Sequence, residues 1–246
     1  MDLQAAAERW SLMLGEPYEQ GAAGYTTRVT LPDGTPAVLK VSTPHRESEH
    51  EGDALRAWDG DGAIRLLAQE GDALLLEGCE PGTRLSALAQ DDALDVLIGL
   101  LPRLWIPAAE PFHTLADEAA WWYPQLPRTK LGDAAREAID ALAHTQGEQV
   151  LLHQDLHGDN VLAAQREPWL AIDPKPLVGE REFAVAPIVR SFELGHTKRD
   201  VLHRFDRLTA ELGLNRERAR GWTIAQTVAW SNSASHPRDS VAEWLL

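Results

Sequence analysis

The sequence predicts an α+β fold in which strands come first and helices follow. Two hairpin patterns and two helical patterns fill the first 77 residues, and helical spacing of apolar residues dominates the rest. A strand-loop-strand pattern between residues 151 and 173 interrupts the helical part. Because strands and helices are segregated along the chain and do not alternate, the expected class is α+β.

A helix and a hairpin are expected at the start of the chain. Apolar residues recur at helical spacing from Leu3 to Leu14, and Gly15 ends the pattern. Residues 25–31 and 37–41 are rich in β-branched and apolar side chains, with a Pro-Asp-Gly-Thr turn between them. This arrangement predicts a hairpin whose second strand carries a lysine.

A second helix and a second hairpin complete the first part. The helix is expected over residues 47–60, because acids fill its first turn and apolar residues follow. Residues 63–68 and 73–77 predict two strands around a Glu-Gly-Asp turn. Residues 78–82, Gly-Cys-Glu-Pro-Gly, contain strong structure breakers and are expected to link two lobes.

The remainder of the chain is expected to be mostly helical. Pro102 should kink or end the first of these helices, and Asn215 can cap the last. The apolar periodicity places helices near residues 94–104, 116–123, 135–142, 201–212 and 219–230.

The most informative stretch lies between the strand at residues 151–152 and the acid Asp173. Its loop carries His153, Asp155 and Asn160, with the spacing of the catalytic loop of protein kinases. In that chemistry the Asp orients and deprotonates an attacking hydroxyl, while the Asn and a second Asp hold Mg²⁺ against nucleotide phosphates. The pattern predicts Asp155 as the catalytic base, and Asn160 and Asp173 as metal ligands.

The sequence of this loop is compatible with two other interpretations. His153 and His157 are four residues apart, as in a zinc-binding helix, but Gln154 stands where such a site has its glutamate. The apolar run before the loop and Gly158 within it favour a strand and a loop over a helix. The remaining alternative is an acidic surface loop without chemistry.

A family resemblance rests on two segments of this stretch. Residues 153–160, His-Gln-Asp-Leu-His-Gly-Asp-Asn, and residues 172–176, Ile-Asp-Pro-Lys-Pro, resemble the aminoglycoside phosphotransferase family of the kinase-like superfamily. The pair is most similar to the streptomycin 6-kinase and hydroxyurea phosphotransferase group. The resemblance extends from Val38 to Trp230.

The resemblance implies a two-lobed protein-kinase-like fold with a small β-rich N-lobe and a mostly helical C-lobe. We expect residues 1–77 to form the N-terminal nucleotide-binding lobe and residues 78–82 the inter-lobe linker. Residues 83–246 should form the helical C-terminal lobe with the catalytic and substrate sites.

Further nucleotide-binding residues follow from the kinase pattern. Lys40 ends an Ala-Val-Leu-Lys strand close to the Val-Ala-Ile-Lys of protein kinases, whose lysine binds the α- and β-phosphates. By resemblance to the family's Glu-x-x-Ala-Leu-x-x-Trp stretch, Glu51 is its expected partner. Glu77 and Cys79 mark the linker, whose backbone meets the adenine ring in such folds. Residues 21–24, Gly-Ala-Ala-Gly, stand where a phosphate-covering loop would lie, and a plain turn is an equal interpretation.

Composition narrows the functional class. The net charge of −15 argues against partners that need basic patches, namely nucleic acid and anionic membranes. A single cysteine excludes an internal disulfide and fits a reducing compartment. With no signal-peptide pattern at the N-terminus and no long apolar run, we expect a soluble, cytoplasmic protein.

The expected activity is transfer of the γ-phosphoryl group of ATP, or of GTP, to a hydroxyl of a small molecule with Mg²⁺. The family implies an aminoglycoside such as streptomycin, whose cationic groups would need acidic side chains to bind them. Asp159 and Glu193 are the candidate substrate-binding acids. The alternative is that both are ordinary solvent-facing acids. Hydroxyurea or another small metabolite is the second hypothesis, and a non-catalytic kinase-like binding protein the third. Protein-kinase activity is not expected, because the Asp-Phe-Gly and Ala-Pro-Glu elements are missing.

Overall fold

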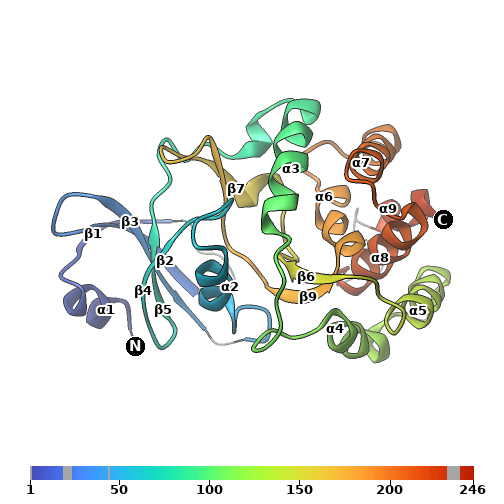
Figure 1. The fold of residues 1–246 in the computed structure, drawn as a ribbon, viewed down its shortest axis with the longest axis horizontal. Helices are drawn as coiled ribbons and strands as arrows, with labels where there is room; N and C mark the ends of the chain where they lie inside the picture. Colours follow the sequence, from blue (N-terminus) through green and yellow to red (C-terminus); the bar gives the residue numbers. More distant parts are fainter. Residues whose placement is uncertain (1, 19–23, 44, 232–238) are drawn as a thin grey trace. The chain divides into compact units, whose positions relative to one another are not determined.

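The computed structural model describes residues 2–18, 24–43, 45–231 and 239–246 (Figure 1). The chain forms two compact units. The first comprises Met1–Arg84 and Val161–Lys175, and the second comprises Leu85–Asn160 and Pro176–Leu246. The first unit therefore includes residues 78–82, the predicted linker, and the hairpin that follows the catalytic-loop sequence.

The first unit is built on a five-stranded antiparallel sheet with strand order β1-β2-β3-β5-β4. One face of the sheet packs against α1 (Leu3–Arg9), where Ala6 and Ala7 meet Leu39 and Leu75 in a buried core. The strands are β1 (Met13–Pro17), β2 (Gly24–Thr30), β3 (Pro36–Ser42), β4 (Leu66–Glu70) and β5 (Ala73–Glu77). Both predicted hairpins are therefore present.

The predicted N-terminal helix is too long. It ends at Arg9, the chain turns through Ser11 with a left-handed φ of 55°, and β1 begins at Met13. Met13 and Leu14 are exposed on this strand, although they matched the helical spacing. Their backbone pairs with β2, so tertiary strand pairing overrides the local apolar periodicity.

Helix α2 (Glu51–Trp58) starts later than the predicted residue 47. Residues 46–50 form turns, and Glu51 opens the helix. Its buried side, with Ala54, Leu55 and Trp58, packs toward the sheet. This start places Glu51 in the first helical turn.

A two-stranded hairpin, β7 (Val161–Ala163) and β8 (Trp169–Ala171), completes the first unit. The backbone of Ala171 bonds to Gly62 O at 2.9 Å and to Ile64 N at 3.0 Å. The Arg166 side chain donates to Glu77, to Gly60 O and to Ala63 O. These contacts fix the hairpin, and the turn that follows β8 carries Asp173.

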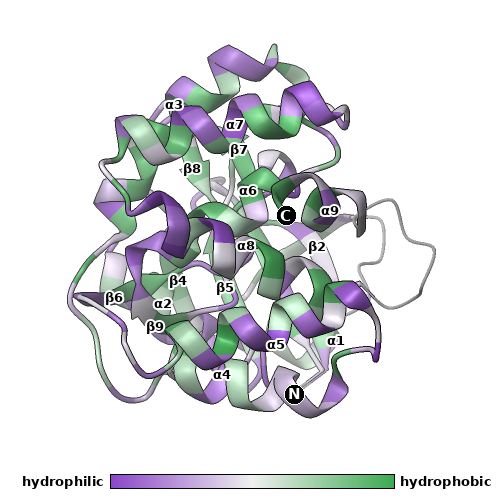
Figure 2. Cartoon of the chain, turned by 90° about the vertical axis from the view of Figure 1, so that its right-hand side faces the viewer, coloured by the Kyte–Doolittle hydropathy of each residue, from purple (hydrophilic) through white to green (hydrophobic). Residues whose placement is uncertain are grey.

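The second unit is mostly helical, as predicted. Helices α5 and α8 lie side by side (Figures 1 and 2), and purple and green bands alternate along α5 (Figure 2). Asn215 caps α8 by accepting from the backbone of Glu217 and Arg218, as expected. The helices are α3 (Gln90–Leu104), α4 (Leu115–Trp122), α5 (Lys130–Leu142), α6 (Ala186–Val189), α7 (Lys198–Glu211), α8 (Arg216–Ala229) and α9 (Asp239–Leu245).

A short ladder within the second unit holds the start of the catalytic-loop sequence. Strand β6 (Gln149–Leu152) pairs antiparallel with β9 (Leu177–Glu180), which the sequence did not predict. Phe183, just after β9, stacks on Trp122 and meets Trp222 edge-on, with ring centroids 6.1 and 5.8 Å away. Trp122 is therefore a core residue. Among the described residues, no helix is long and apolar enough to cross a membrane.

Candidate active site

Lys40, Glu51 and Asp173 meet in the first unit. Lys40 lies on β3, in register with Thr26 and Leu74 on the flanking strands, and its side chain is buried. Its Nζ donates to Glu51 Oε1 at 2.8 Å, to Glu51 Oε2 at 2.7 Å, and to Asp173 Oδ1. Lysine and aspartate are 133 residues apart in sequence. The predicted partner Glu51 is the residue that pairs with Lys40.

The charges of this group are strongly coupled. Burial favours the neutral amine, but the carboxylates of Glu51 and Asp173 outweigh it and raise the pKa of Lys40. Burial also raises the pKa of Glu51 to about 7, although the Lys40 ammonium opposes this shift. Glu51 is 2 % exposed, whereas the Asp173 side chain is about half exposed, at 47 %. Lys40 therefore stays an ammonium, and Asp173 is the solvent-accessible carboxylate beside it.

The backbone at Asp173 has a left-handed φ of 56°. Non-glycine residues in this region are uncommon, and they concentrate at functional sites because surrounding structure must hold them there. The β7–β8 ladder ends at Ala171, two residues before Asp173, and Lys40 holds the Asp173 side chain.

A cavity of about 500 Å³ lies within the first unit. Val38 from β3, the Gly78–Gly82 backbone and Leu162 from β7 line it, together with Arg28 stacked on Tyr18 at 4.8 Å. Since Arg28 and Val38 are partners across β2 and β3, both lie on the sheet face that carries Lys40. The cavity is thus lined by apolar side chains, by the backbone of residues 78–82 and by the planar guanidinium of Arg28.

The two predicted linker residues have different environments. Cys79 lines the cavity, and burial raises the pKa of its thiol to about 11, so the thiol stays protonated. The Glu77 carboxylate accepts from Arg166 and from the backbone of Arg65. Its side chain therefore anchors the β7–β8 hairpin. Residues 21–23 of the predicted phosphate-covering loop lie outside the described residues.

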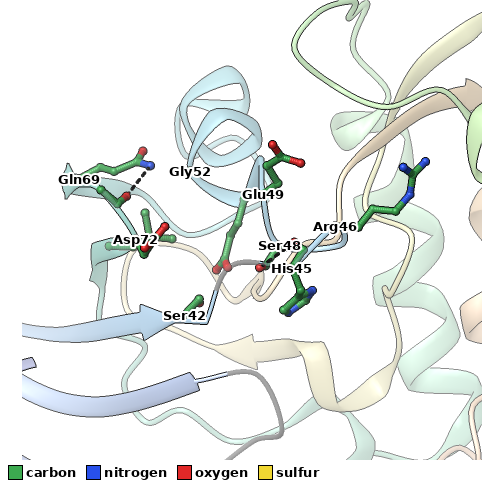
Figure 3. Close-up of a pocket in the computed structure, with 11 residues that line it drawn as sticks. Ser42, His45, Arg46, Ser48, Glu49, Gly52, Gln69 and Asp72 are labelled. Atoms are coloured by element: carbon green, nitrogen blue, oxygen red, sulfur yellow. Dashed lines mark hydrogen bonds between the residues drawn. The ribbon is translucent and has the colours of Figure 1, made fainter. Parts of the chain in front are cut away.

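A second cavity of about 420 Å³ lies between α2, the segment after β3 and the β4–β5 turn (Figure 3). Figure 3 shows Glu49 and Asp72 among its polar lining residues, and Gln69 donating to Gly71 O. A Cβ on Gly52 would lie 2.3 Å from Gln69 Oε1, so the Gln69 side chain occupies the space that Gly52 leaves open. Neither Lys40 nor the linker lines this cavity.

The catalytic-loop sequence folds as predicted in the second unit, between β6 and a 3₁₀ turn at Gly158–Asn160. Gln154, which is 3 % exposed, adopts a left-handed φ of 62°. Asn160 Nδ2 donates to Asp155 O at 2.9 Å, which fixes the amide and directs its oxygen away from that backbone. Asp155 itself is buried, and its Oδ1 accepts from Arg190 Nη2 at 3.3 Å.

The predicted substrate acids both have protein partners. Ser86 donates to Asp159. His157 Nδ1 donates to Glu193 Oε1 at 2.7 Å, and His157 Nε2 lies 4.0 Å from Asp155 Oδ1. Burial opposes ionisation of Glu193, but the interactions with His157 and Ser191 together outweigh it and lower the pKa of Glu193 to about 2. Glu193 is therefore a carboxylate that orients His157.

Comparison with known proteins identifies the family. The family of aminoglycoside/hydroxyurea antibiotic resistance kinases matches residues 9–238. The hydroxyurea phosphotransferase of Kitasatospora aureofaciens is 44 % identical over 90 % of this chain and 68 % of its own length. The streptomycin 6-kinase of Streptomyces griseus is 39 % identical, over 89 % of this chain and 77 % of its own.

Solved structures agree on the fold. A choline kinase, LicA from Streptococcus pneumoniae, superposes with a TM-score of 0.68 at 14 % identity, over 98 % of both chains. The aminoglycoside phosphotransferase APH(4)-Ia gives a TM-score of 0.60 at 14 % identity, over 98 % of this chain and 94 % of its own. The predicted protein-kinase-like fold is thereby confirmed. The chain belongs to the aminoglycoside/hydroxyurea antibiotic resistance kinase family and is a phosphotransferase that uses an alcohol group as acceptor.

Proposed function

We propose that this protein transfers the γ-phosphoryl group of ATP, or of GTP, to a hydroxyl of a small cationic molecule in the cytoplasm, with Mg²⁺ as cofactor. A streptomycin-type aminoglycoside is the first candidate acceptor. The main support for the proposal is the pair of ionic contacts made by Lys40. Its ammonium lies between the buried carboxylate of Glu51 and the exposed carboxylate of Asp173. In kinases such a lysine binds nucleotide phosphates.

The nucleotide base is assigned to the 500 Å³ cavity of the first unit. Val38 and Leu162 offer apolar surfaces for a flat ring, and the backbone near Cys79 offers hydrogen-bonding groups. Lys40 follows Val38 by two residues on the same face of β3, so phosphates leaving this cavity would meet its ammonium. Relatives of the same fold were solved with AMP, in LicA, and with AMP-PNP, in APH(4)-Ia.

The residues present fit a magnesium ion. The exposed carboxylate of Asp173 and the amide oxygen of Asn160 are hard oxygen ligands of the kind that Mg²⁺ prefers. When bound, Mg²⁺ would neutralise charge on the phosphates. The salt bridge to Lys40 keeps Asp173 oriented, and the hydrogen bond to Asp155 O keeps Asn160 oriented.

The proposed reaction assigns one role to each side chain. Asp155 orients the acceptor hydroxyl and takes its proton as the oxygen attacks the γ-phosphorus. The bond to the bridging oxygen breaks, and the nucleoside diphosphate leaves. Lys40, held by Glu51, stabilises charge on the phosphates. Since phosphoryl transfer depends chiefly on positioning and electrostatics, the fixed geometry of these groups is the main contribution of the protein.

The acids proposed for a cationic acceptor are Asp159 and Glu193. Asp159 belongs to the catalytic loop and Glu193 contacts it through His157, so a cationic substrate would share them with Ser86 and His157. Hydroxyurea is the second candidate, favoured by the 44 % identity to a hydroxyurea phosphotransferase.

The test is a nucleotide-diphosphate release assay with ATP or GTP, with and without Mg²⁺, across streptomycin, other aminoglycosides and hydroxyurea. Release that needs both Mg²⁺ and streptomycin, and that is lost in Asp155→Ala, supports the first candidate. The same pattern with hydroxyurea alone supports the second. Nucleotide binding without release on any acceptor would favour a binding protein, and no nucleotide binding would refute the proposal.

A further inference from the structure

The segment between α6 and α7 is held rigidly by one buried arginine. Arg204 on α7 is fully buried, and its guanidinium donates to four backbone carbonyls of residues 189–195 at 2.8–2.9 Å. A buried guanidinium that satisfies four carbonyls is costly to disrupt, because both the charge and the carbonyls would lose their partners. The conformation of residues 189–195 is therefore fixed.

This segment contacts the catalytic loop at two points. Arg190 reaches Asp155 Oδ1 with Nη2 at 3.3 Å, and Glu193 accepts from His157 Nδ1 at 2.7 Å. Gly158 lies close to the same segment: a Cβ there would lie 3.0 Å from Leu194 and 3.3 Å from Glu193, so these side chains would have to shift. The loop is thus held on both sides of Leu156 by the same seven-residue segment.

A second element braces the arginine itself. Gln226 on α8 accepts from Arg190 Nε at 3.3 Å and donates to Gln154 O at 3.0 Å. The Arg190 guanidinium also lies 4.4 Å over the Trp230 ring. Arg190 is 5 % exposed, so these contacts confine it to one orientation. Gln226 ties that orientation to the backbone beside Asp155.

We infer that Arg190 is a positioning residue for Asp155, holding the carboxylate by Oδ1 in the orientation that meets the acceptor hydroxyl. This inference rests on the proposed function, which makes Asp155 the base. Such a role suits phosphoryl transfer, which gains more from alignment of the hydroxyl than from strong deprotonation.

The test is a double-mutant cycle between Arg190 and Asp155, read as kcat and KM. Arg190→Met should lower kcat by about 10- to 100-fold and leave both KM values within about twofold, since misalignment of a base affects the chemical step. In the Asp155→Asn background, the same substitution should cost less than about twofold, because the group it positions is gone. Arg190→Lys keeps the positive charge but lacks the planar guanidinium, so its kcat should lie between those of Arg190→Met and the wild type.

Control variants separate positioning from general stability. Arg218→Met removes another arginine of the second unit, paired with Glu180, and should lower thermal stability without changing kcat of the folded fraction. Gln226→Met keeps Arg190 but removes its brace, and should give a smaller loss of kcat than Arg190→Met. Circular dichroism establishes that each variant is folded before its kinetics are compared.

The outcomes separate the positioning role of Arg190 from the proposed function, in which Asp155 is the base. A loss that is present in the wild-type background and absent with Asp155→Asn supports the inference. An equal loss in both backgrounds overturns it, since Arg190 would then act without Asp155. Wild-type kcat in Arg190→Met also overturns it and leaves the proposed function standing. If Asp155→Asn itself keeps full kcat, both the positioning role of Arg190 and the assignment of Asp155 as the base are refuted.

Discussion

Lys40 Nζ lies 2.7–2.8 Å from both carboxylate oxygens of Glu51, a buried acid eleven residues further along the chain. Lys40 also binds Asp173, so one ammonium joins β3, the first turn of α2 and the turn after β8. The two acids differ in exposure, and this difference separates their proposed roles. Glu51 holds the lysine, and Asp173 is about half exposed, in keeping with its proposed role as a metal ligand.

We expect Glu51→Gln and Lys40→Met to lower kcat by about 100-fold or more, the usual effect of removing one electrostatic contact to a reacting phosphate. Without the Glu51 charge, Lys40 would be drawn to Asp173 and away from the phosphates. Steady-state kinetics at saturating acceptor give the effect. Asp53→Asn, on the exposed side of the same helix, is the matched control and should keep wild-type kcat. Unchanged turnover in Lys40→Met would contradict the assignment.

Asp155→Ala is expected to fold and to lose about 10²- to 10⁴-fold in kcat, the range for removal of a general base. Its thermal unfolding should remain cooperative, because β6 and the Arg204 contacts do not depend on this side chain. Single-turnover kinetics with a saturating nucleotide would measure the chemical step directly. A variant with wild-type turnover would remove Asp155 as the base.

Gly78→Ala should weaken nucleotide binding and cost about 1–3 kcal/mol of unfolding free energy, the usual range for overpacking. A Cβ at this position would lie 2.8 Å from Pro36 O, a backbone atom, so the linker or β3 must shift. The nucleotide KM and urea unfolding report the two effects. Gly99→Ala, in an exposed stretch of α3 with open space around it, is the control and should be neutral or slightly stabilising. An unchanged nucleotide KM in Gly78→Ala would argue against the assigned base cavity.

Glu193 predicts a specific acid dependence of stability. Its pKa is lowered from 4.5 to about 2, so its ionised form contributes stability that is complete above pH 4.5 and lost as the pH falls toward 2. Glu193→Gln should remove about 2 kcal/mol of this pH-dependent stability, after allowance for partial exposure. Urea unfolding at neutral pH and at about pH 3 measures the difference, with Glu137→Gln on α5 as an exposed control. Equal acid dependence in wild type and Glu193→Gln would contradict the His157–Glu193 pairing.

Local patterns predicted much of the fold and part of the candidate site. The two hairpins, most helices and the Asn215 cap depend on neighbouring residues, so periodicity and turn chemistry were enough. The loop spacing of Asp155 and Asn160 is equally local. The pairing of Lys40 with Glu51 followed from family resemblance, because the residues between them do not encode the contact.

The features that were missed depend on distant partners. Strand β1 looked helical because an exposed edge strand has no required alternation, and its pairing with β2 is a tertiary effect. Strand β9 is four residues long and follows prolines, so nothing local distinguishes it from a loop. Arg190 was not selected from the sequence, and His157 was considered only as a zinc ligand, because their partners Asp155 and Glu193 are 35 and 36 positions away. Glu193 was noticed as an acid, but its partner could not be predicted.

The most direct test of the central claim is mass spectrometry of the acceptor after incubation with Mg²⁺ and ATP carrying ¹⁸O on the γ-phosphate. We predict a streptomycin, or alternatively a hydroxyurea, that gains one phosphoryl group retaining the ¹⁸O label. Asp155→Ala under the same conditions should give no labelled acceptor. Labelled inorganic phosphate with an unmodified acceptor would show transfer to water, and would contradict the claim that this chain phosphorylates a hydroxyl of a small molecule.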